Sequence, residues 1–165
     1  MERNLREKAQ KIKLFTMDVD GVLTDGRIFL GNEGQEFKAF HSQDGQGIKL
    51  LQKKGILTAI ITGRSSRLVE IRAGELDIKE VYQGVDDKLS ILCHLLGKHG
   101  LSYEEVASIG DDIGDLPLLE KAGLSFTVAD GVAKVKEEAD LVTDSRGGRG
   151  AVREACEIIL EAKEK

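Results

Sequence analysis

Apolar residues along this chain fall alternately into short continuous runs and longer stretches with helical spacing. The short runs predict strands at residues 13–17, 57–61, 106–109, 124–128 and 141–142, with a weaker strand near Val81. The helical stretches predict helices at residues 2–11, 47–54, 66–74, from 86 onward, 116–122, near Val132 and from about 151. Strands that alternate with helices favour a parallel sheet with helices on both faces. We therefore expect one α/β domain that spans residues 1–165.

Capping signals mark several of the predicted helix starts. Ser66 and Asp86 are expected to cap the helices that follow them, because their side-chain oxygens can accept hydrogen bonds from unpaired backbone amides. Ser102 and Glu105 have the spacing of a capping box just before the run at 106–109. These signals agree with the alternation of helices and strands.

Residues 27–40 interrupt this alternation. Two β-prone runs, 27–30 and 35–40, flank the turn-rich sequence Gly-Asn-Glu-Gly and predict a β-hairpin. A two-stranded ribbon would leave much of its apolar surface uncovered; the residues concerned are Ile28, Phe29, Phe37 and Phe40. The hairpin is therefore interpreted as a flap over a site, an oligomer contact or both, with a plain exposed hairpin as the alternative.

Composition narrows the class of protein. The chain has 165 residues, 41% hydrophobic and 32% charged, which suits one soluble domain. A net charge of -5, an aromatic content of 4% and the lack of a Lys/Arg-rich block argue against a nucleic-acid partner. No apolar run approaches the ~20 residues of a membrane span, so no membrane partner is expected. Cys93 and Cys156 have helical spacings that predict buried, reduced thiols and a cytoplasmic location.

Carboxylates gather where the first predicted strand ends. Asp18 and Asp20 follow the run at 13–17, and Gly21 allows a tight turn directly after them. Two acids so close together repel unless a cation joins them, and without a nearby His or Cys that cation would be hard and oxygen-seeking. A solvated turn is the alternative for this stretch taken alone.

Further polar residues share this edge of the predicted sheet. Thr62 ends one strand, Asp111 and Asp112 end another, and Lys88 begins a helix. In open α/β sheets the carboxyl ends of the strands meet at one edge, where ligands bind. A hydroxyl, an ammonium and carboxylates around a divalent ion are the parts that phosphoryl transfer needs. Thr62 or Lys88 alone would more often be an ordinary strand-end hydroxyl or a solvated lysine.

Four sequence motifs carry a family resemblance. Asp-Val-Asp-Gly-Val-Leu-Thr at 18–24, Thr62, Lys88 and Gly-Asp-Asp-Ile-Gly-Asp at 110–115 resemble, in order, the motifs of the haloacid dehalogenase superfamily of phosphatases. The resemblance implies a Rossmann-like fold in which Asp18 is the nucleophile and forms an aspartyl-phosphate, and Asp20 is the acid/base. It also implies Mg²⁺ as cofactor, held by Asp18, the backbone carbonyl of Asp20, and Asp111.

The same resemblance assigns the neighbouring residues. Thr62 and Lys88 would bind the phosphoryl oxygens, and Asp20 and Gly63 are also expected to bind the substrate. Asp112 and Asp115 are interpreted as outer groups that orient metal-bound waters or Lys88, with capping of the helix at 116–122 as the alternative for Asp115.

Within the superfamily, the chain resembles the 3-deoxy-D-manno-octulosonate 8-phosphate phosphatases, small members without a large cap domain. The segments concerned are 20–26 with its hairpin, His-Ser-Gln-Asp-Gly-Gln-Gly at 41–47, Ile-Thr-Gly-Arg-Ser-Ser at 61–66 and Gly-Gly-Arg-Gly-Ala-Val-Arg-Glu at 147–154. This implies hydrolysis of a small-molecule sugar-acid phosphate in lipopolysaccharide biosynthesis. It also implies a homotetramer in which a neighbouring subunit helps to cover each site.

Several assignments keep alternatives. Arg64 is expected to pair with a substrate carboxylate, unless it is simply an exposed arginine at a helix start. Gly147 to Gly150 would let a terminal segment bring Arg149 or Arg153 to a site, or would form a flexible linker. His41 lies where it could touch substrate, whereas the other two histidines fit a helix and its end.

Three rival functions remain from the sequence. A nonulosonate 9-phosphate phosphatase would share the chemistry and differ in the pocket, and Arg64 favours the octulosonate. A non-catalytic oligomerisation module would not need the intact motif residues. A phospho-accepting signalling receiver would have no obvious use for Asp20.

Overall fold

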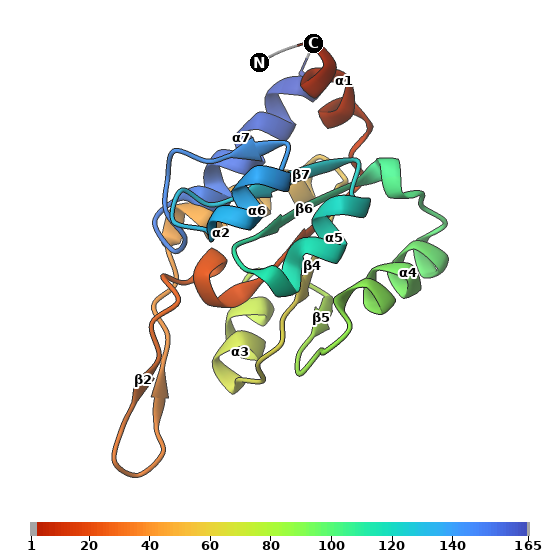
Figure 1. The fold of residues 1–165 in the computed structure, drawn as a ribbon. Helices are drawn as coiled ribbons and strands as arrows, with labels where there is room; N and C mark the ends of the chain where they lie inside the picture. The colour runs from red at the N-terminus through yellow and green to blue at the C-terminus, as the bar shows by residue number, and fades with distance from the viewer. Residues whose placement is uncertain (1–2, 165) are drawn as a thin grey trace.

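A six-stranded parallel sheet forms the centre of the protein (Figure 1). The computed structural model describes residues 3–164. The strands lie in the order β5-β4-β1-β6-β7-β8, and each neighbouring pair is parallel. Their bounds are β1 (Leu14–Met17), β4 (Leu57–Ile61), β5 (Glu80–Tyr82), β6 (Val106–Gly110), β7 (Leu124–Thr127) and β8 (Leu141–Val142). The strand that precedes Asp18 is thus central, between the strands that precede Thr62 and Asp111.

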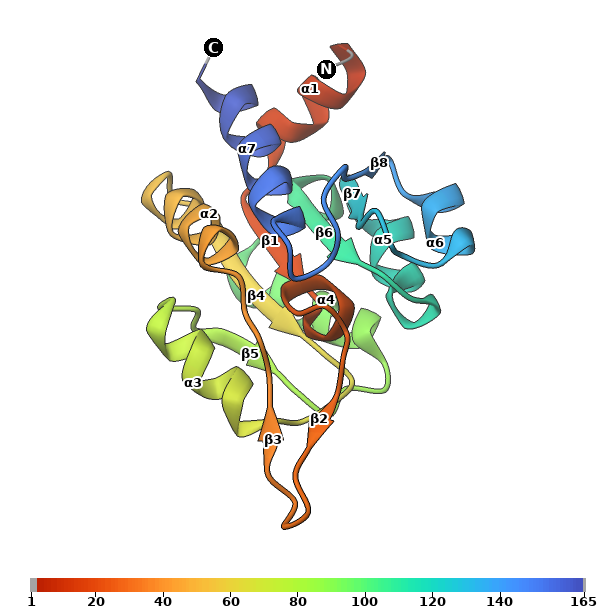
Figure 2. The ribbon, with the colours of Figure 1, turned by 90° about the vertical axis from the view of Figure 1, so that its left-hand side faces the viewer.

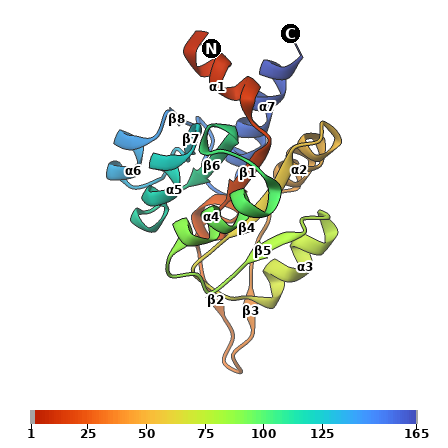
Figure 3. The ribbon, with the colours of Figure 1, turned by 90° about the vertical axis from the view of Figure 1, so that its right-hand side faces the viewer.

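Helices cover both faces of this sheet, as the sequence predicted. Figure 2 looks onto the face with α2 and α7, and Figure 3 onto the face with α4. The bounds are α1 (Arg3–Lys11), α2 (Ser42–Lys53), α3 (Arg67–Glu75), α4 (Lys88–His99), α5 (Leu116–Lys121), α6 (Ala133–Glu138) and α7 (Ala151–Lys163). Neighbouring strand residues alternate between two cores: Phe15 packs with α2 and α7, and Leu14 with α4. None of the helices within residues 3–164 is long and apolar enough to cross a bilayer.

The predicted hairpin is present and extends away from the sheet (Figures 1 and 2). It pairs β2 (Phe29–Leu30) with β3 (Glu36–Phe37) in antiparallel register. Leu30 is 70% and Phe37 65% exposed, whereas Phe40 is partly buried against the core. The hairpin is the only insertion of note among the described residues, and no large cap domain is present.

Three local predictions were wrong. The second helix begins at Ser42 instead of residue 47, because Gly45 and Gly47 are buried where α2 packs closely on its neighbours. Asp87, next to the predicted Asp86, caps α4 by accepting a 3.2 Å hydrogen bond from the Ser90 amide. Cys93 is exposed, since it lies off the buried stripe of α4.

Other local predictions are confirmed. Ser66 caps α3 through a 3.3 Å hydrogen bond from the Leu68 amide. Ser102 and Glu105 form the predicted capping box, and Cys156 is buried. The first helix was predicted to begin at residue 2, which lies outside the described residues.

Candidate active site

The loop after β1 presents Asp18 and Asp20 at the carboxyl edge of the sheet. The Asp18 amide donates to the carbonyl of Ile109 on β6, and the Thr24 amide closes the turn on the carbonyl of Val19 at 3.0 Å. Gly21 has a φ of 93°, and a Cβ there would lie 2.1 Å from Oδ2 of Asp111. Only glycine fits this approach between the first and last motifs.

Asp115 organises the turn that follows β6. Its Oδ2 accepts hydrogen bonds from the amides of Asp111 at 3.0 Å and Asp112 at 3.3 Å. Its Oδ1 accepts from Nζ of Lys88 at 2.6 Å. The structure therefore supports the orientation of Lys88, whereas the alternative that Asp115 caps the helix at 116–122 is wrong: its side chain makes no cap hydrogen bond at α5 and instead completes a capping box with Asp112 in the turn Ile113–Asp115.

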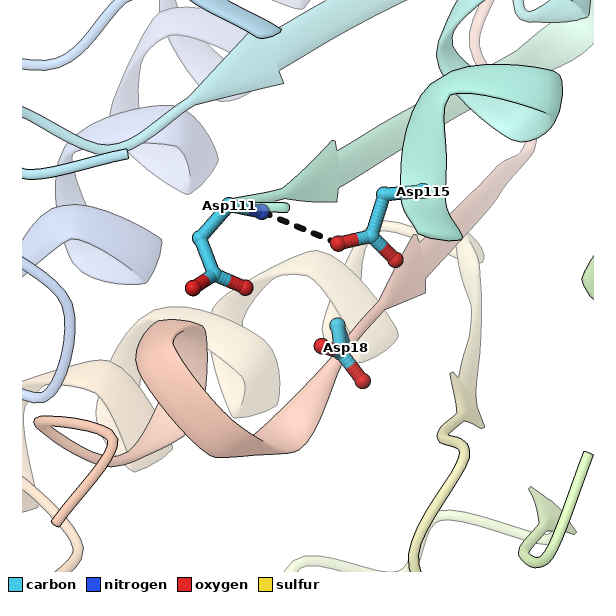
Figure 4. A group of neighbouring side chains, drawn as sticks. All are labelled: Asp18, Asp111 and Asp115. Carbon is cyan, nitrogen blue, oxygen red and sulfur yellow. Dashed lines mark hydrogen bonds between the residues drawn. The ribbon is translucent and has the colours of Figure 1, made fainter. Parts of the chain in front are cut away.

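Three carboxylates converge beside Lys88. One oxygen each from Asp18, Asp111 and Asp115 lies within 4.8 Å of the others (Figure 4). Lys88 Nζ lies 3.0 Å from Oδ1 of Asp18, and Oδ1 of Asp111 is buried without a hydrogen-bond partner. Three acids and one ammonium leave excess negative charge, and an oxygen-only donor set suits a hard divalent cation. The residues therefore fit the Mg²⁺ that the resemblance implies.

The protonation of these groups reflects their crowding. Burial, reinforced by the charge of Asp115, raises the pKa of Asp18 to about 6. Burial, with the charges of Asp115 and Asp18, raises the pKa of Asp111 to about 7. Burial opposes the charge on Lys88, but Asp115 and Asp18 outweigh it and raise its pKa. Lys88 thus stays charged while the carboxylates resist ionisation together.

This crowding predicts a pH dependence of stability in the metal-free protein. The unfolded chain loses these protons near pH 3.8, whereas folded Asp18 and Asp111 keep them to about pH 6 and 7. The folded state binds more protons, so the free energy of unfolding falls as pH rises through this window. With chelator, we expect a fall on the order of 4 kcal/mol between pH 5 and 8, measured by denaturant unfolding.

A matched variant isolates the source of this pH dependence. Asp111→Asn should remove much of the slope, whereas Asp77→Asn, at an exposed site, should leave it unchanged. Mg²⁺ should stabilise the parent most at the high-pH end, because the ionised carboxylates bind it. A stability in chelator that is constant or rises from pH 5 to 8 would contradict the electrostatic description.

A cavity of about 310 Å³ opens on this edge of the sheet. The predicted residues that line it are Asp18, Asp20, Thr62, Gly63, Arg64, Lys88, Asp112 and Asp115. Asp111 lies behind the wall, against Gly21. The structure thus brings these eight residues to one cavity, with Asp111 directly after the neighbouring strand β6.

The chain is similar in sequence to known hydrolases. The profile of the family described as haloacid dehalogenase-like hydrolase matches residues 69–155. The 3-deoxy-D-manno-octulosonate 8-phosphate phosphatase KdsC of Escherichia coli (strain K12) is 49% identical over 158 residues, which are 96% of this chain and 84% of the relative. This chain belongs to the haloacid dehalogenase-like hydrolases. The family resemblance of the motifs is confirmed.

Solved structures of similar hydrolases have the same fold. The 3-deoxy-D-manno-octulosonate 8-phosphate phosphatase of Yersinia pestis has a TM-score of 0.98 at 45% identity, covering 100% of this chain and 89% of that one. The Moraxella catarrhalis enzyme, solved with magnesium, phosphate and KDO, has a TM-score of 0.97 at 47% identity, covering 99% and 94%. A cobalt-bound Haemophilus influenzae enzyme has a TM-score of 0.92 at 40% identity, covering 96% and 92%. The predicted α/β fold is confirmed.

Two residues of this hydrolase's site were missed by sequence reasoning. The side chain of Lys38 is 1% exposed and forms an ion pair with Asp20. Glu36 accepts a 3.2 Å hydrogen bond from Nη2 of Arg64. The available signal was the alternation of side chains along a strand. This alternation places Glu36 and Lys38 on the same face of the hairpin, opposite Phe37. The prediction for the hairpin rested instead on its apolar residues, which indicated a flap or an oligomer contact.

The glycines at 147–150 do not form a flexible linker. A Cβ on Gly147 would lie 1.8 Å from the carbonyl oxygen of Gly21, and the Gly148 amide donates to the carbonyl of Val22 at 2.8 Å. The segment is therefore packed against the loop that carries the first motif, and the linker interpretation is wrong.

The remaining basic candidates have other contacts. Arg149 lies 3.6 Å from Asp25 and Arg153 pairs with Glu157 at 2.6 Å. Neither arginine lines the cavity, and neither does His41. Arg64 does line it, with its side chain 46% exposed.

Proposed function

We propose that this protein hydrolyses 3-deoxy-D-manno-octulosonate 8-phosphate to the free sugar acid and phosphate, in lipopolysaccharide biosynthesis. The observation that carries the proposal is the convergence of Asp18, Asp20 and Lys88 on one cavity with Arg64. The similar phosphatases of that name support the choice of substrate.

The chemistry proceeds in two displacements. An oxygen of Asp18 attacks phosphorus, the bond from phosphorus to the sugar oxygen breaks, and Asp20 gives that oxygen its proton. Asp20 then takes a proton from water, which attacks the aspartyl-phosphate and releases phosphate while restoring Asp18. Lys88 and the hydroxyl of Thr62 hold the phosphoryl oxygens throughout. Asp115 orients Lys88 through its 2.6 Å hydrogen bond.

Asp18, Asp111 and the backbone carbonyl of Asp20 would hold Mg²⁺. When bound, the ion neutralises charge on the phosphoryl group during its transfer. Asp112 lines the cavity and would orient water at its edge. The buried, unpaired Oδ1 of Asp111 supports this donor set.

Arg64 supports a substrate that carries a carboxylate. A guanidinium binds a carboxylate through two parallel hydrogen bonds, and the exposed side chain of Arg64 lines the cavity beside the predicted phosphate site. Arg64 favours the octulosonate over a nonulosonate 9-phosphate, for which an acidic residue is expected at this position.

Phosphate release from the octulosonate phosphate, a nonulosonate 9-phosphate and an aryl phosphate tests the proposal. We expect the first to be preferred strongly and its turnover to require Mg²⁺ and stop with chelator. Activity on the aryl phosphate alone would support the proposed phosphatase chemistry and overturn the proposed substrate. Absence of activity on all three would favour the non-catalytic alternative.

A homotetramer and a cytoplasmic location remain predictions. The exposed apolar residues of the hairpin support self-association, because a monomer rarely leaves such a patch uncovered; they are Ile28, Phe29, Leu30 and Phe37. Hairpins that meet at the centre of a tetramer would bury this surface.

A further inference from the structure

Lys38 belongs to a ring of four charges beside the cavity. Its Nζ contacts Oδ1 of Asp20 and lies 3.5 Å from Oε1 of Glu36. The same Glu36 oxygen accepts from Nη2 of Arg64 at 3.2 Å, and Nε of Arg64 lies 3.7 Å from Oδ2 of Asp20. Cations and carboxylates alternate around this ring, so their formal charges cancel.

The two oxygens of Asp20 have different surroundings. Lysine has N–H donors and no acceptor, so Oδ1 accepts from Lys38, and the positive charge of the ammonium disfavours a proton on that oxygen while this contact holds. Oδ2 is buried and has no hydrogen-bond partner, and Arg64 Nε at 3.7 Å is beyond hydrogen-bond distance. A proton on Asp20 therefore sits on Oδ2.

We propose that Lys38 is a positioning residue, which anchors Oδ1 of Asp20 and thereby directs Oδ2 toward the leaving-group oxygen. The inference rests on the proposed function, in which Asp20 transfers the proton. Such a transfer requires the two heavy atoms to approach within ~2.6–3.2 Å. An aspartate without an anchor turns freely about its side-chain bonds, so fewer of its orientations meet this condition.

Through Lys38, the hairpin contacts the active site of its own chain. Lys38, directly after β3, forms an ion pair with Asp20, and Glu36 on β3 accepts a hydrogen bond from Arg64. The burial of Lys38 also requires its ion pairs, because an unpaired buried ammonium is costly. A test must therefore separate positioning of the acid from simple attachment of the hairpin.

Leaving-group dependence separates these two roles. Lys38→Met removes the charge and keeps much of the length of the side chain. We expect kcat/KM for the octulosonate phosphate to fall about 10- to 100-fold, and kcat/KM for a nitrophenyl phosphate to stay within about 3-fold. A sugar alkoxide must be protonated as it leaves, whereas a nitrophenolate leaves unaided. kcat/KM reports the steps through phosphorylation of Asp18, so later hydrolysis does not contribute.

Companion variants complete the experiment. Lys38→Arg keeps a cation and should recover most of the lost activity on the sugar phosphate. Lys49→Met removes a partly exposed ammonium that pairs with Asp77 and should leave kcat/KM unchanged for both substrates. Lys38→Gln, which can still donate to Asp20, serves if Lys38→Met does not fold by circular dichroism.

An equal loss on both esters would overturn the positioning role, and so would an unchanged rate on the sugar phosphate. Failure of the proposed function is visible separately in the parent protein. If the parent cleaves a different alkyl phosphate, the substrate proposal fails, and the Lys38 comparison is made on the ester that it cleaves.

Discussion

Asp18→Asn is expected to lower phosphate release from every ester by about 10⁴-fold or more. An amide cannot attack phosphorus, so the aspartyl-phosphate does not form. The substitution keeps the shape of the side chain and removes one of the crowded, buried carboxylates, whose pKa is raised to about 6. Above that pH and without metal, the variant should unfold at the same temperature as the parent or a higher one. Thermal unfolding and phosphate release measure both effects.

Asp77→Asn is the matched control for Asp18→Asn. Asp77 is an exposed carboxylate paired with Lys49, so its loss should leave turnover at the parental rate. An Asp18→Asn variant that kept more than about a hundredth of parental activity, after exclusion of deamidation by mass spectrometry, would remove Asp18 from the role of nucleophile.

Asp20→Asn is expected to lower turnover of the sugar phosphate by about 10²- to 10⁴-fold, the usual contribution of a general acid or base. The asparagine can neither protonate the leaving oxygen nor activate water. With a nitrophenyl phosphate, Asp18 should still be phosphorylated, and the resulting aspartyl-phosphate should be hydrolysed slowly. The expected signature is a burst of nitrophenol close to one equivalent per site, with phosphate retained on the protein.

Asp25→Asn provides the comparison in the same loop. Asp25 pairs with Arg27 and Arg149 and does not line the cavity, so this variant should show steady turnover without a burst. If Asp20→Asn hydrolysed the sugar phosphate at the parental rate, Asp20 would not be the acid/base. A parent protein that itself retained phosphate would resemble a signalling receiver.

The sheet and its acidic edge were predictable because both depend on local pattern. The runs at 57–61 and 106–109 are almost entirely buried in the structure. In a parallel sheet every such run ends at the same edge, so polar residues that follow different strands are brought together. The cavity contains these residues as predicted.

Other features could not be predicted from the local sequence, because tertiary contacts determine them. Gly45 and Gly47 are weak helix formers, but in α2 they allow close packing against Arg72 and α7. Asp86 and Asp87 are adjacent carboxylates with equal capping potential, and only the path of the chain selects Asp87. Nothing next to Lys38 in the sequence indicates that its ammonium reaches Asp20.

The contact between Gly147 and Gly21 has a consequence for when the enzyme acquires its function during synthesis. A nascent chain that has emerged through β8 contains all the strands of the sheet described above. It still lacks the Gly148 amide that pairs with the carbonyl of Val22. The loop that carries Asp18 and Asp20 is then without its final support, although both acids are already translated. Competence for catalysis is therefore gained late, after most of the hydrophobic core can form.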